Sequence, residues 1–379
     1  MMYQLTEDQE LLLQTVNEFG AQRLAPTVLQ RDAANEFDES LVKELLDLGL
    51  QGICFPEEYG GAGASYVDYI LALRDICKYD DGIGITYSAS VSLGASPIDV
   101  FGTPEQKEKY LRPVAEGKTL AAFALTEPNA GTDAASQLTV AEKVGDEYII
   151  NGSKMFITNA GPADVYVIFA MTDKSQGTKG ISAFIIEKGM PGFTFGPEEH
   201  KMGIHTSITR ELIFKDLHVP AANLLGQEGK GFKIAMHTLD GGRIGVAAQA
   251  TGIAQAALQH AVEYTKQREQ FGRAIAKFQH TQFKLAEMAT KVEAANLMLL
   301  NAANDKAAGR PYTVSAAMAK MFCSDVAMEV ATDAVQLFGG YGYSEDYPVA
   351  RLFRNAKITQ IYEGTNEVQK MVVSGAVLR

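Results

Sequence analysis

Three long stretches of helical pattern, separated by short links, dominate the C-terminal part of this chain of 379 residues. They run over 243–270, over about 280–309, and from 313 to 338, where Thr313 can cap the third and Gly339 and Gly340 end it. Shorter helices flank residues 361–364. Long helices with short links pack as antiparallel neighbours, so the pattern predicts a four-helix-bundle-like domain over 226–379.

The segment 121–225 carries a different pattern. Short apolar runs are bounded by Gly, Pro, Asp and Lys, and they lie over 148–150, 165–169, 181–186, 193–195 and 212–214. Such spacing predicts an antiparallel β-barrel or sandwich domain, because the strand–helix alternation of a parallel sheet is missing. Asn151-Gly152 predicts a hairpin turn.

Residues 1–120 predict a helical domain. Thr6 and Gln9 have the spacing of a capping box, and Asp38 can cap a second helix. Thr103-Pro104 marks another helix start, since proline loses no hydrogen bond in the first turn. The predicted fold class is therefore α+β, with domains over 1–120, 121–225 and 226–379.

Charge and composition restrict the function classes. A net charge of −12 argues against a nucleic-acid binder. Three widely spaced cysteines, Cys54, Cys77 and Cys323, predict a reducing compartment. No apolar run approaches the ~20 residues of a membrane span, and the N-terminus carries acids where a leader carries bases, so we expect a cytoplasmic protein. The six histidines lack the spacing of metal ligands, so no metal site is expected.

Five local sequences carry more specific information. They are Leu-Thr-Glu-Pro-Asn-Ala-Gly-Thr-Asp at 125–133, Phe-Pro-Glu-Glu-Tyr-Gly-Gly at 55–61, Gln-Arg-Glu-Gln-Phe-Gly at 267–272, Gln-Leu-Phe-Gly-Gly at 336–340 and Ile-Tyr-Glu-Gly-Thr-Asn-Glu at 361–367. In order and spacing they resemble the acyl-CoA dehydrogenases, over the whole chain. The chain is most similar to the short-chain branch, the butyryl-CoA dehydrogenases of anaerobic bacteria.

The resemblance implies bound FAD where the β domain meets the C-terminal bundle. Hydroxyls, small residues and an aromatic ring on the β domain would contact it: Phe123, Leu125, Thr126, Gly131, Thr132, Phe156, Ile157 and Thr158. A neighbouring subunit would contribute Arg268, Gln270, Phe271, Gln279, Gln336, Gly339 and Gly340. Thr365 and Glu367 match further FAD contacts. Because the site is shared, the resemblance implies a homotetramer, a dimer of dimers.

The resemblance also assigns Glu363 as the catalytic base that removes the α-proton of an acyl-CoA thioester. A closed apolar pocket would raise its pKa. Tyr362, Gly364, Thr132, Asp240 and Arg243 match substrate-binding residues, with Arg243 directed toward the phosphates or adenine of CoA. Some branches carry the base at a position matching Gly241 or Gly242, and neither glycine can act as a base.

The implied reaction is the oxidation of butyryl-CoA to crotonyl-CoA, with electrons passed to an electron-transfer flavoprotein. Three alternatives stay open from the sequence. The enzyme could prefer another acyl chain length, it could be an acyl-CoA oxidase that reduces dioxygen, or the chain could be a non-catalytic helical scaffold.

Overall fold

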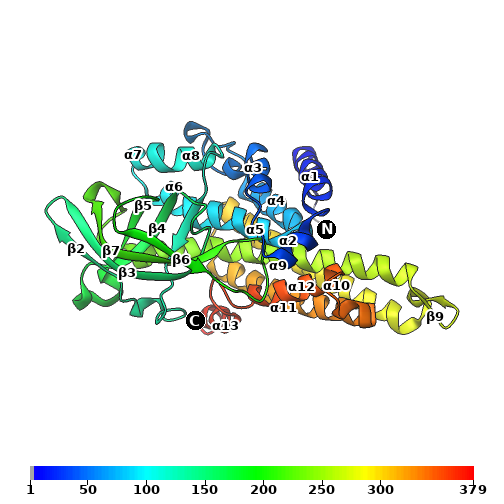
Figure 1. Cartoon of the computed structure of the whole chain (residues 1–379). Coiled ribbons are helices and arrows are strands. Elements are labelled where there is room, and N and C mark those ends of the chain that lie inside the picture. The colour runs from blue at the N-terminus through cyan, green and yellow to red at the C-terminus, as the bar shows by residue number, and fades with distance from the viewer. Residues whose placement is uncertain (1–3) are drawn as a thin grey trace.

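The computed structural model describes residues 4–379, so the first three residues of the predicted N-terminal domain lie outside it. A curved sheet lies at one end of the molecule, and long helices extend from beneath it to the opposite end (Figure 1). A layer of shorter helices covers the upper side of both in that view. The helix–strand–helix order along the chain is the predicted one.

The N-terminal helices begin where their capping residues predict. Thr6 and Gln9 form the reciprocal capping box, with both backbone-to-side-chain hydrogen bonds at 3.2 Å. Asp38 caps its helix through the amides of Ser40 and Leu41. The helices are α1 (Glu7–Phe19), α2 (Val28–Ala34), α3 (Glu39–Asp47), α4 (Tyr66–Tyr79), α5 (Asp81–Ser88), α6 (Ser96–Phe101), α7 (Pro104–Gln106) and α8 (Arg112–Ala115).

The segment between α5 and α6 matters for the site. Residues 89–95 continue α5 as a fully buried π-helical stretch that ends against the start of the sheet. A Cβ on Gly94 would lie 2.6 Å from the Cβ of Ala121, so glycine permits this close approach. This packing fixes the N-terminal domain against both the sheet and the long helices.

The middle domain is one eight-stranded sheet in the order β6-β7-β3-β2-β4-β5-β8, with β1 beside β4. Its strands are β1 (Ala121–Ala124), β2 (Val140–Val144), β3 (Glu147–Thr158), β4 (Val165–Met171), β5 (Ile181–Glu187), β6 (Phe193–Glu198), β7 (Thr209–Pro220) and β8 (Leu224–Leu225). Most pairs are antiparallel as predicted, but β4 pairs in parallel with β1 and, at one position, with β2. The sheet is therefore mixed.

The predicted turn at Asn151-Gly152 is wrong. Strand β3 runs straight through it with a bulge, and the β2–β3 hairpin turns instead at Gly145, whose φ is +61°. Asn151 exchanges hydrogen bonds with Asp216 on β7, at 2.8 and 3.2 Å. Gly152 is required by space, because a Cβ there would lie 2.5 Å from the Thr139 hydroxyl. Contacts with neighbouring strands override the local turn preference.

The C-terminal domain contains α9 (Gly231–Gln267), α10 (Gln279–Ala307), α11 (Thr313–Phe338), α12 (Pro348–Thr359) and α13 (Asn366–Val377). A small hairpin, β9 (Glu269–Gln270) with β10 (Arg273–Ala274), closes the far end between α9 and α10. Helix α9 begins at 231 rather than 243, so the predicted start was too late. Thr313 does not cap α11, because its hydroxyl donates to Asp240 at 2.6 Å.

Candidate active site

Glu363 lies in the tight loop between α12 and α13. Its φ is +57°, unusual for a residue with a side chain, and Gly364 follows at +87°. The Oε2 atom of the carboxyl is buried and has no hydrogen-bond partner in the described chain. Burial raises the pKa of Glu363 to about 7, although the charges of Arg243 and Lys320 lower it. The result is a carboxyl that can take up and release a proton near neutral pH.

Helix α9 and the buried 89–95 segment form the wall beside this carboxyl. A Cβ on Gly242 would lie 2.6 Å from Glu363 Oε2 and 2.7 Å from Leu93 Cδ2. The glycine therefore leaves the space that the carboxyl needs. Gly242, one of the two positions at which the resemblance places the alternative base, faces the Glu363 carboxyl.

Two predicted substrate residues, Asp240 and Arg243, form an ion pair on α9. Arg243 Nη1 donates to Asp240 Oδ1 at 2.6 Å, and the Arg243 side chain is almost fully buried. Its charge is the larger of the two that lower the pKa of Glu363. The Arg243 charge therefore acts on Glu363, and the contact of Arg243 with the phosphates or adenine of CoA stays a prediction.

Several residues that hold the Glu363 loop in place were not predicted from the sequence. Lys320, on α11, donates to the Gly364 carbonyl oxygen at 2.8 Å, and Gln369 Nε2 donates to the same oxygen at 2.8 Å. The Tyr362 hydroxyl donates to Gln249 on α9. No sequence signal identifies them, because Lys and Gln on helices are usually exposed.

The predicted β-domain contacts lie on two neighbouring segments. Phe123 is on β1, and Leu125 and Thr126 follow it, while Gly131 and Thr132 are exposed further along the same loop. Thr126 accepts a 2.8 Å hydrogen bond through its carbonyl from the amide of Met155 on β3, which joins the two segments.

A buried ion pair stabilises this loop. Lys154 Nζ donates to Glu127 at 2.7 Å, to Gln137 at 3.0 Å and to the Leu125 carbonyl at 3.2 Å. Glu127 also accepts from the amides of Leu138 and Thr139. All three donors of the ammonium are satisfied, so the pair can stabilise the loop despite the cost of burying charge. This ion pair of Lys154 and Glu127 was not predicted from the sequence.

Phe156, Ile157 and Thr158 lie at the end of β3. Phe156 adopts a φ of +60° at a break in the β3–β7 register, and its side chain is 60% exposed. Ile157 is buried on the opposite face, and Thr158 is half-buried. An apolar ring held at the surface by a strained backbone provides a flat binding surface for a planar ligand.

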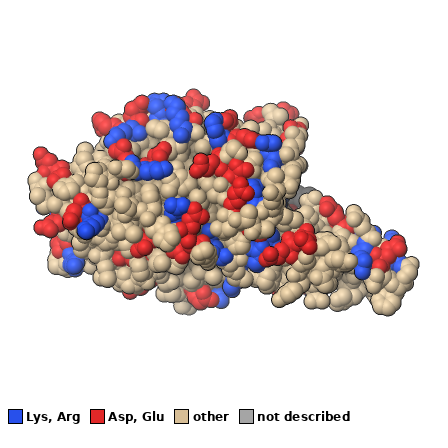
Figure 2. All heavy atoms as spheres, in the orientation of Figure 1, with Lys and Arg blue, Asp and Glu red and all other residues tan. Residues whose placement is uncertain are grey.

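The remaining predicted cofactor residues lie elsewhere in the molecule. The hairpin of β9 and β10, with the adjoining ends of α9 and α10, forms an arm that lies away from the sheet (Figure 1). The arm carries four exposed residues of the prediction: Arg268, Gln270, Phe271 and Gln279. Phe271 is 94% exposed. The same arm projects from the body in Figure 2 and carries acidic and basic side chains at its tip.

A second group lies beside the arm. Gln336, Gly339 and Gly340 are exposed at the end of α11, and the Arg268 guanidinium lies 5.5 Å from the ring centre of Tyr341. Thr365 caps α13 by accepting from the amide of Val368, and Glu367 is exposed. One chain thus brings Glu363 together with its helices, but it does not bring the arm to the β-domain segments.

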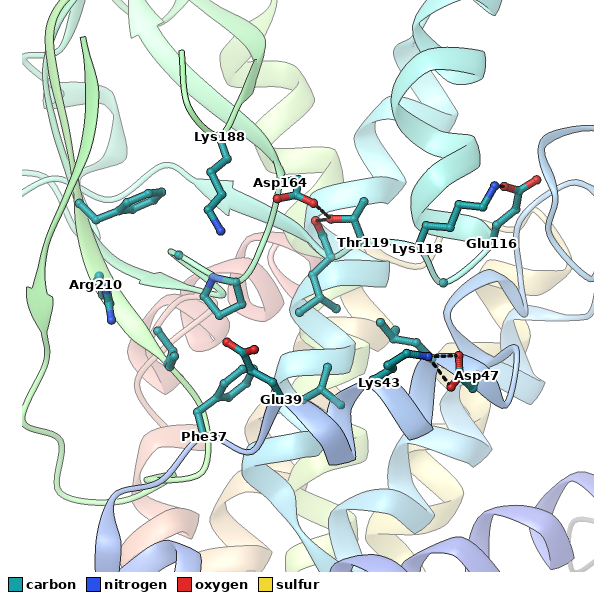
Figure 3. A pocket seen from close by; sticks show the side chains of 18 residues that line it. Phe37, Glu39, Lys43, Asp47, Glu116, Lys118, Thr119, Asp164, Lys188 and Arg210 are labelled. Atoms are coloured by element: carbon teal, nitrogen blue, oxygen red, sulfur yellow. Dashed lines mark hydrogen bonds and ion pairs between the residues drawn. The ribbon is translucent and has the colours of Figure 1, made fainter. Parts of the chain in front are cut away.

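A separate cavity of about 810 Å³ lies between α3, the segment before β1 and the β domain (Figure 3). Four of its charged groups pair with one another: Lys43 with Asp47 at 2.8 Å and Lys118 with Glu116 at 2.5 Å. None of the predicted site residues lines it, so we assign it no part in the site. Among residues 4–379, no helix is both long and apolar enough to cross a membrane.

Comparison with known proteins identifies the family. Three family models match in order: the N-terminal domain of acyl-CoA dehydrogenase at residues 6–118, the middle domain at 122–217 and the C-terminal domain at 229–378. The short-chain specific acyl-CoA dehydrogenase of Megasphaera elsdenii is 60% identical over the full length of both chains.

Solved structures agree with this result. The butyryl-CoA dehydrogenase of Megasphaera elsdenii is 60% identical and superposes with a TM-score of 0.99, covering all of both chains. A structure describing the electron transferring flavoprotein of Acidaminococcus fermentans contains a chain that is 63% identical, with a TM-score of 0.99 and full coverage of both chains. By its three domains, its fold and its identity to these relatives, this chain belongs to the acyl-CoA dehydrogenase family.

Proposed function

We propose that this protein is a FAD-dependent short-chain acyl-CoA dehydrogenase, an oxidoreductase that converts butyryl-CoA to crotonyl-CoA. The observation that carries the assignment is the Glu363 carboxyl, whose Oε2 is buried without a hydrogen-bond partner among residues 4–379 and whose pKa is about 7. A base that removes a proton next to a thioester needs these properties, because a well-solvated carboxylate is too weak a base.

The residues of the β domain fit FAD. The exposed ring of Phe156 can lie against the isoalloxazine, and a Cβ on Gly131 would meet nothing within 4 Å, so the backbone there is open to a ligand. Thr126, Thr132 and Thr158 offer hydroxyls beside them. When bound, FAD supplies the acceptor for the hydride that leaves the β-carbon.

Two parts of the Glu363 loop act on the substrate. The carboxyl takes the α-proton, and its Oε2 is buried beside α9 and Leu93. The amide N–H of Glu363 makes no hydrogen bond within the described chain, so it is free to donate to the thioester oxygen as negative charge develops there. Arg243 favours the ionised carboxyl before the proton is taken.

The arm supports an assembly in which subunits share cofactor sites. Arg268, Gln270, Phe271 and Gln279 cannot serve the β-domain segments of their own chain, because they lie at the opposite end of the molecule (Figure 1). We therefore assign them to the FAD of a neighbouring subunit in a homotetramer, together with Gln336, Gly339 and Gly340.

Electrons from the reduced enzyme pass to an electron-transfer flavoprotein. The 63% identity to a chain found in a structure of such a flavoprotein supports this partner over dioxygen. We place the enzyme in the cytoplasm and in fatty acid metabolism. Its three cysteines are all free, which supports a reducing compartment.

The test of the assignment is anaerobic bleaching of the bound flavin by butyryl-CoA. We expect Glu363→Gln to bind substrate and lose flavin reduction by about two to four orders of magnitude, because the α-proton has no acceptor. Glu142→Gln, at an exposed site on β2, is the matched control and should reduce flavin normally. Near-normal bleaching by Glu363→Gln would exclude it as the base.

Three further assays separate the alternatives. Butyryl-CoA should bleach the flavin faster than longer acyl-CoAs, and a reversed order would assign another chain-length class. Hydrogen peroxide formed in air without a flavoprotein partner would indicate an oxidase. A purified protein that stays colourless after addition of FAD would indicate a non-catalytic scaffold.

A further inference from the structure

Lys320 is a fully buried lysine, and no carboxylate among residues 4–379 lies at ion-pairing distance from it. It lies in the middle of α11, and its side chain is 0% exposed. Its ammonium donates to the Gly364 carbonyl oxygen at 2.8 Å and to Asn366 Oδ1 at 3.0 Å, both neutral acceptors. Burying a charge without a counter-ion is costly, so its presence here requires a gain elsewhere.

Both acceptors belong to the loop that carries Glu363. Gln369 donates to the Glu363 carbonyl at 3.2 Å and to the Gly364 carbonyl at 2.8 Å, so Lys320 and Gln369 hold the same peptide from two directions. Asn366 is also tied to α11, donating to the Ser324 hydroxyl at 2.9 Å. The left-handed backbone at Glu363 is therefore maintained by contacts with α11 and α13.

The neutral amide of Gln369 shows that hydrogen bonding alone does not require a cation. An ammonium adds a positive charge behind the catalytic loop at neutral pH. We propose that Lys320 is a positioning residue for proton abstraction: from α11 it fixes the peptide that orients the Glu363 carboxyl. The proposal rests on the proposed role of Glu363 as base.

Charged groups on α9, α11, α13 and the Glu363 loop set the pKa values of Lys320 and Glu363. Burial lowers the pKa of Lys320 to about 8, while Glu363, Asp325 and Glu367 raise it and Arg243 lowers it. Arg243 and Lys320 both lower the pKa of Glu363. With Lys320 neutralised, Arg243 alone favours the carboxylate, so the pKa of Glu363 must rise.

The experiment compares three variants of the holoenzyme by anaerobic flavin reduction with butyryl-CoA, from about pH 5.5 to about pH 9. Lys320→Met removes both the hydrogen bonds and the charge. Lys320→Gln keeps a donor but removes the charge, and it is the safer variant for folding. Gln369→Met removes hydrogen bonds from the same peptide without a change of charge. Bound FAD and the dissociation constant of crotonyl-CoA are measured in each.

We expect Lys320→Met to lower the limiting rate of reduction about ten- to hundredfold, with FAD content and crotonyl-CoA binding little changed. The acidic limb of its pH profile should move to higher pH, and the same limb should move in Lys320→Gln. In Gln369→Met the rate should fall while the limb stays in place.

An unmoved acidic limb in both Lys320 variants would overturn the proposal, as would wild-type rates in Lys320→Met. Glu363→Gln, measured alongside, separates this failure from failure of the proposed function. If Glu363→Gln is inactive and the Lys320 variants are normal, only the positioning role is lost. If Glu363→Gln reduces flavin normally, the base itself has been misassigned.

Discussion

Two opposing influences act on the carboxyl of Glu363. Burial favours its neutral form, and the charges of Arg243 and Lys320 favour the ionised form. Burial is the stronger, so the pKa moves from 4.5 to about 7. A carboxyl with a pKa of about 7 can accept the α-proton during oxidation of the acyl-CoA and return it in the reverse reaction.

This shift predicts how stability depends on pH. Because the folded protein holds the Glu363 proton more tightly than the unfolded chain, its stability falls as pH rises from 4.5 through about 7. Glu363→Gln has no charge to bury. We expect it to be about 1–3 kcal/mol more stable than the wild type at about pH 8.5, with little difference at about pH 4.5. Urea titrations at the two pH values measure this, and an equal difference at both would contradict it.

At the scale of elements, α9 places two adjacent glycines at functional contacts. A Cβ on Gly242 would meet Glu363 Oε2 at 2.6 Å, and one on Gly241 would meet Lys306 Nζ at 2.6 Å. Glycine inside a helix costs about 1 kcal/mol relative to alanine. Glycine is needed at both positions because Glu363 and Lys306 occupy the space that a Cβ would fill.

The two glycines form a matched pair of variants. Gly242→Ala should displace the catalytic carboxyl and lower the rate of flavin reduction about ten- to hundredfold, with FAD content unchanged. Gly241→Ala should lose much less, because only the flexible end of Lys306 must move. Stopped-flow measurement of flavin reduction compares the two variants. Equal rates in Gly242→Ala and Gly241→Ala would contradict the prediction that α9 confines the Glu363 carboxyl.

At the scale of the whole molecule, the predicted cofactor residues divide into two groups at opposite ends. The β-domain segments and Glu363 lie on the body, whereas Arg268 and Phe271 lie exposed at the tip of the arm. This separation is what the proposed sharing of cofactor sites between subunits requires.

Arg268→Ala tests this arrangement. We expect the variant to purify with less FAD and to dissociate more readily, because a guanidinium suited to phosphate is lost at the shared site. The ratio of flavin to protein absorbance and sedimentation velocity measure the two effects. Lys266→Ala removes an exposed charge two residues away and is the control. Full FAD content in Arg268→Ala would remove the argument for a cross-subunit contact.

Features that depend on residues a few positions apart could be predicted from the sequence. Thr6, Asp38 and Thr103 cap their helices as predicted, because a cap needs only an oxygen and an amide two or three residues away. The helix–strand–helix order followed from local periodicity. The role of Glu363 came from resemblance, since nothing local distinguishes it from an exposed glutamate.

Tertiary structure alone decided the rest. Asn151-Gly152 is part of a strand because β7 pairs with it and Thr139 packs against it. Helix α9 contains Gly241 and Gly242 because Glu363 and Lys306 occupy the space that their Cβ atoms would fill. Lys320 is 43 residues from Glu363 along the chain but bonds to its loop. Burial and distant charges set the chemistry of a carboxyl, and both arise only when separate parts of the chain pack together.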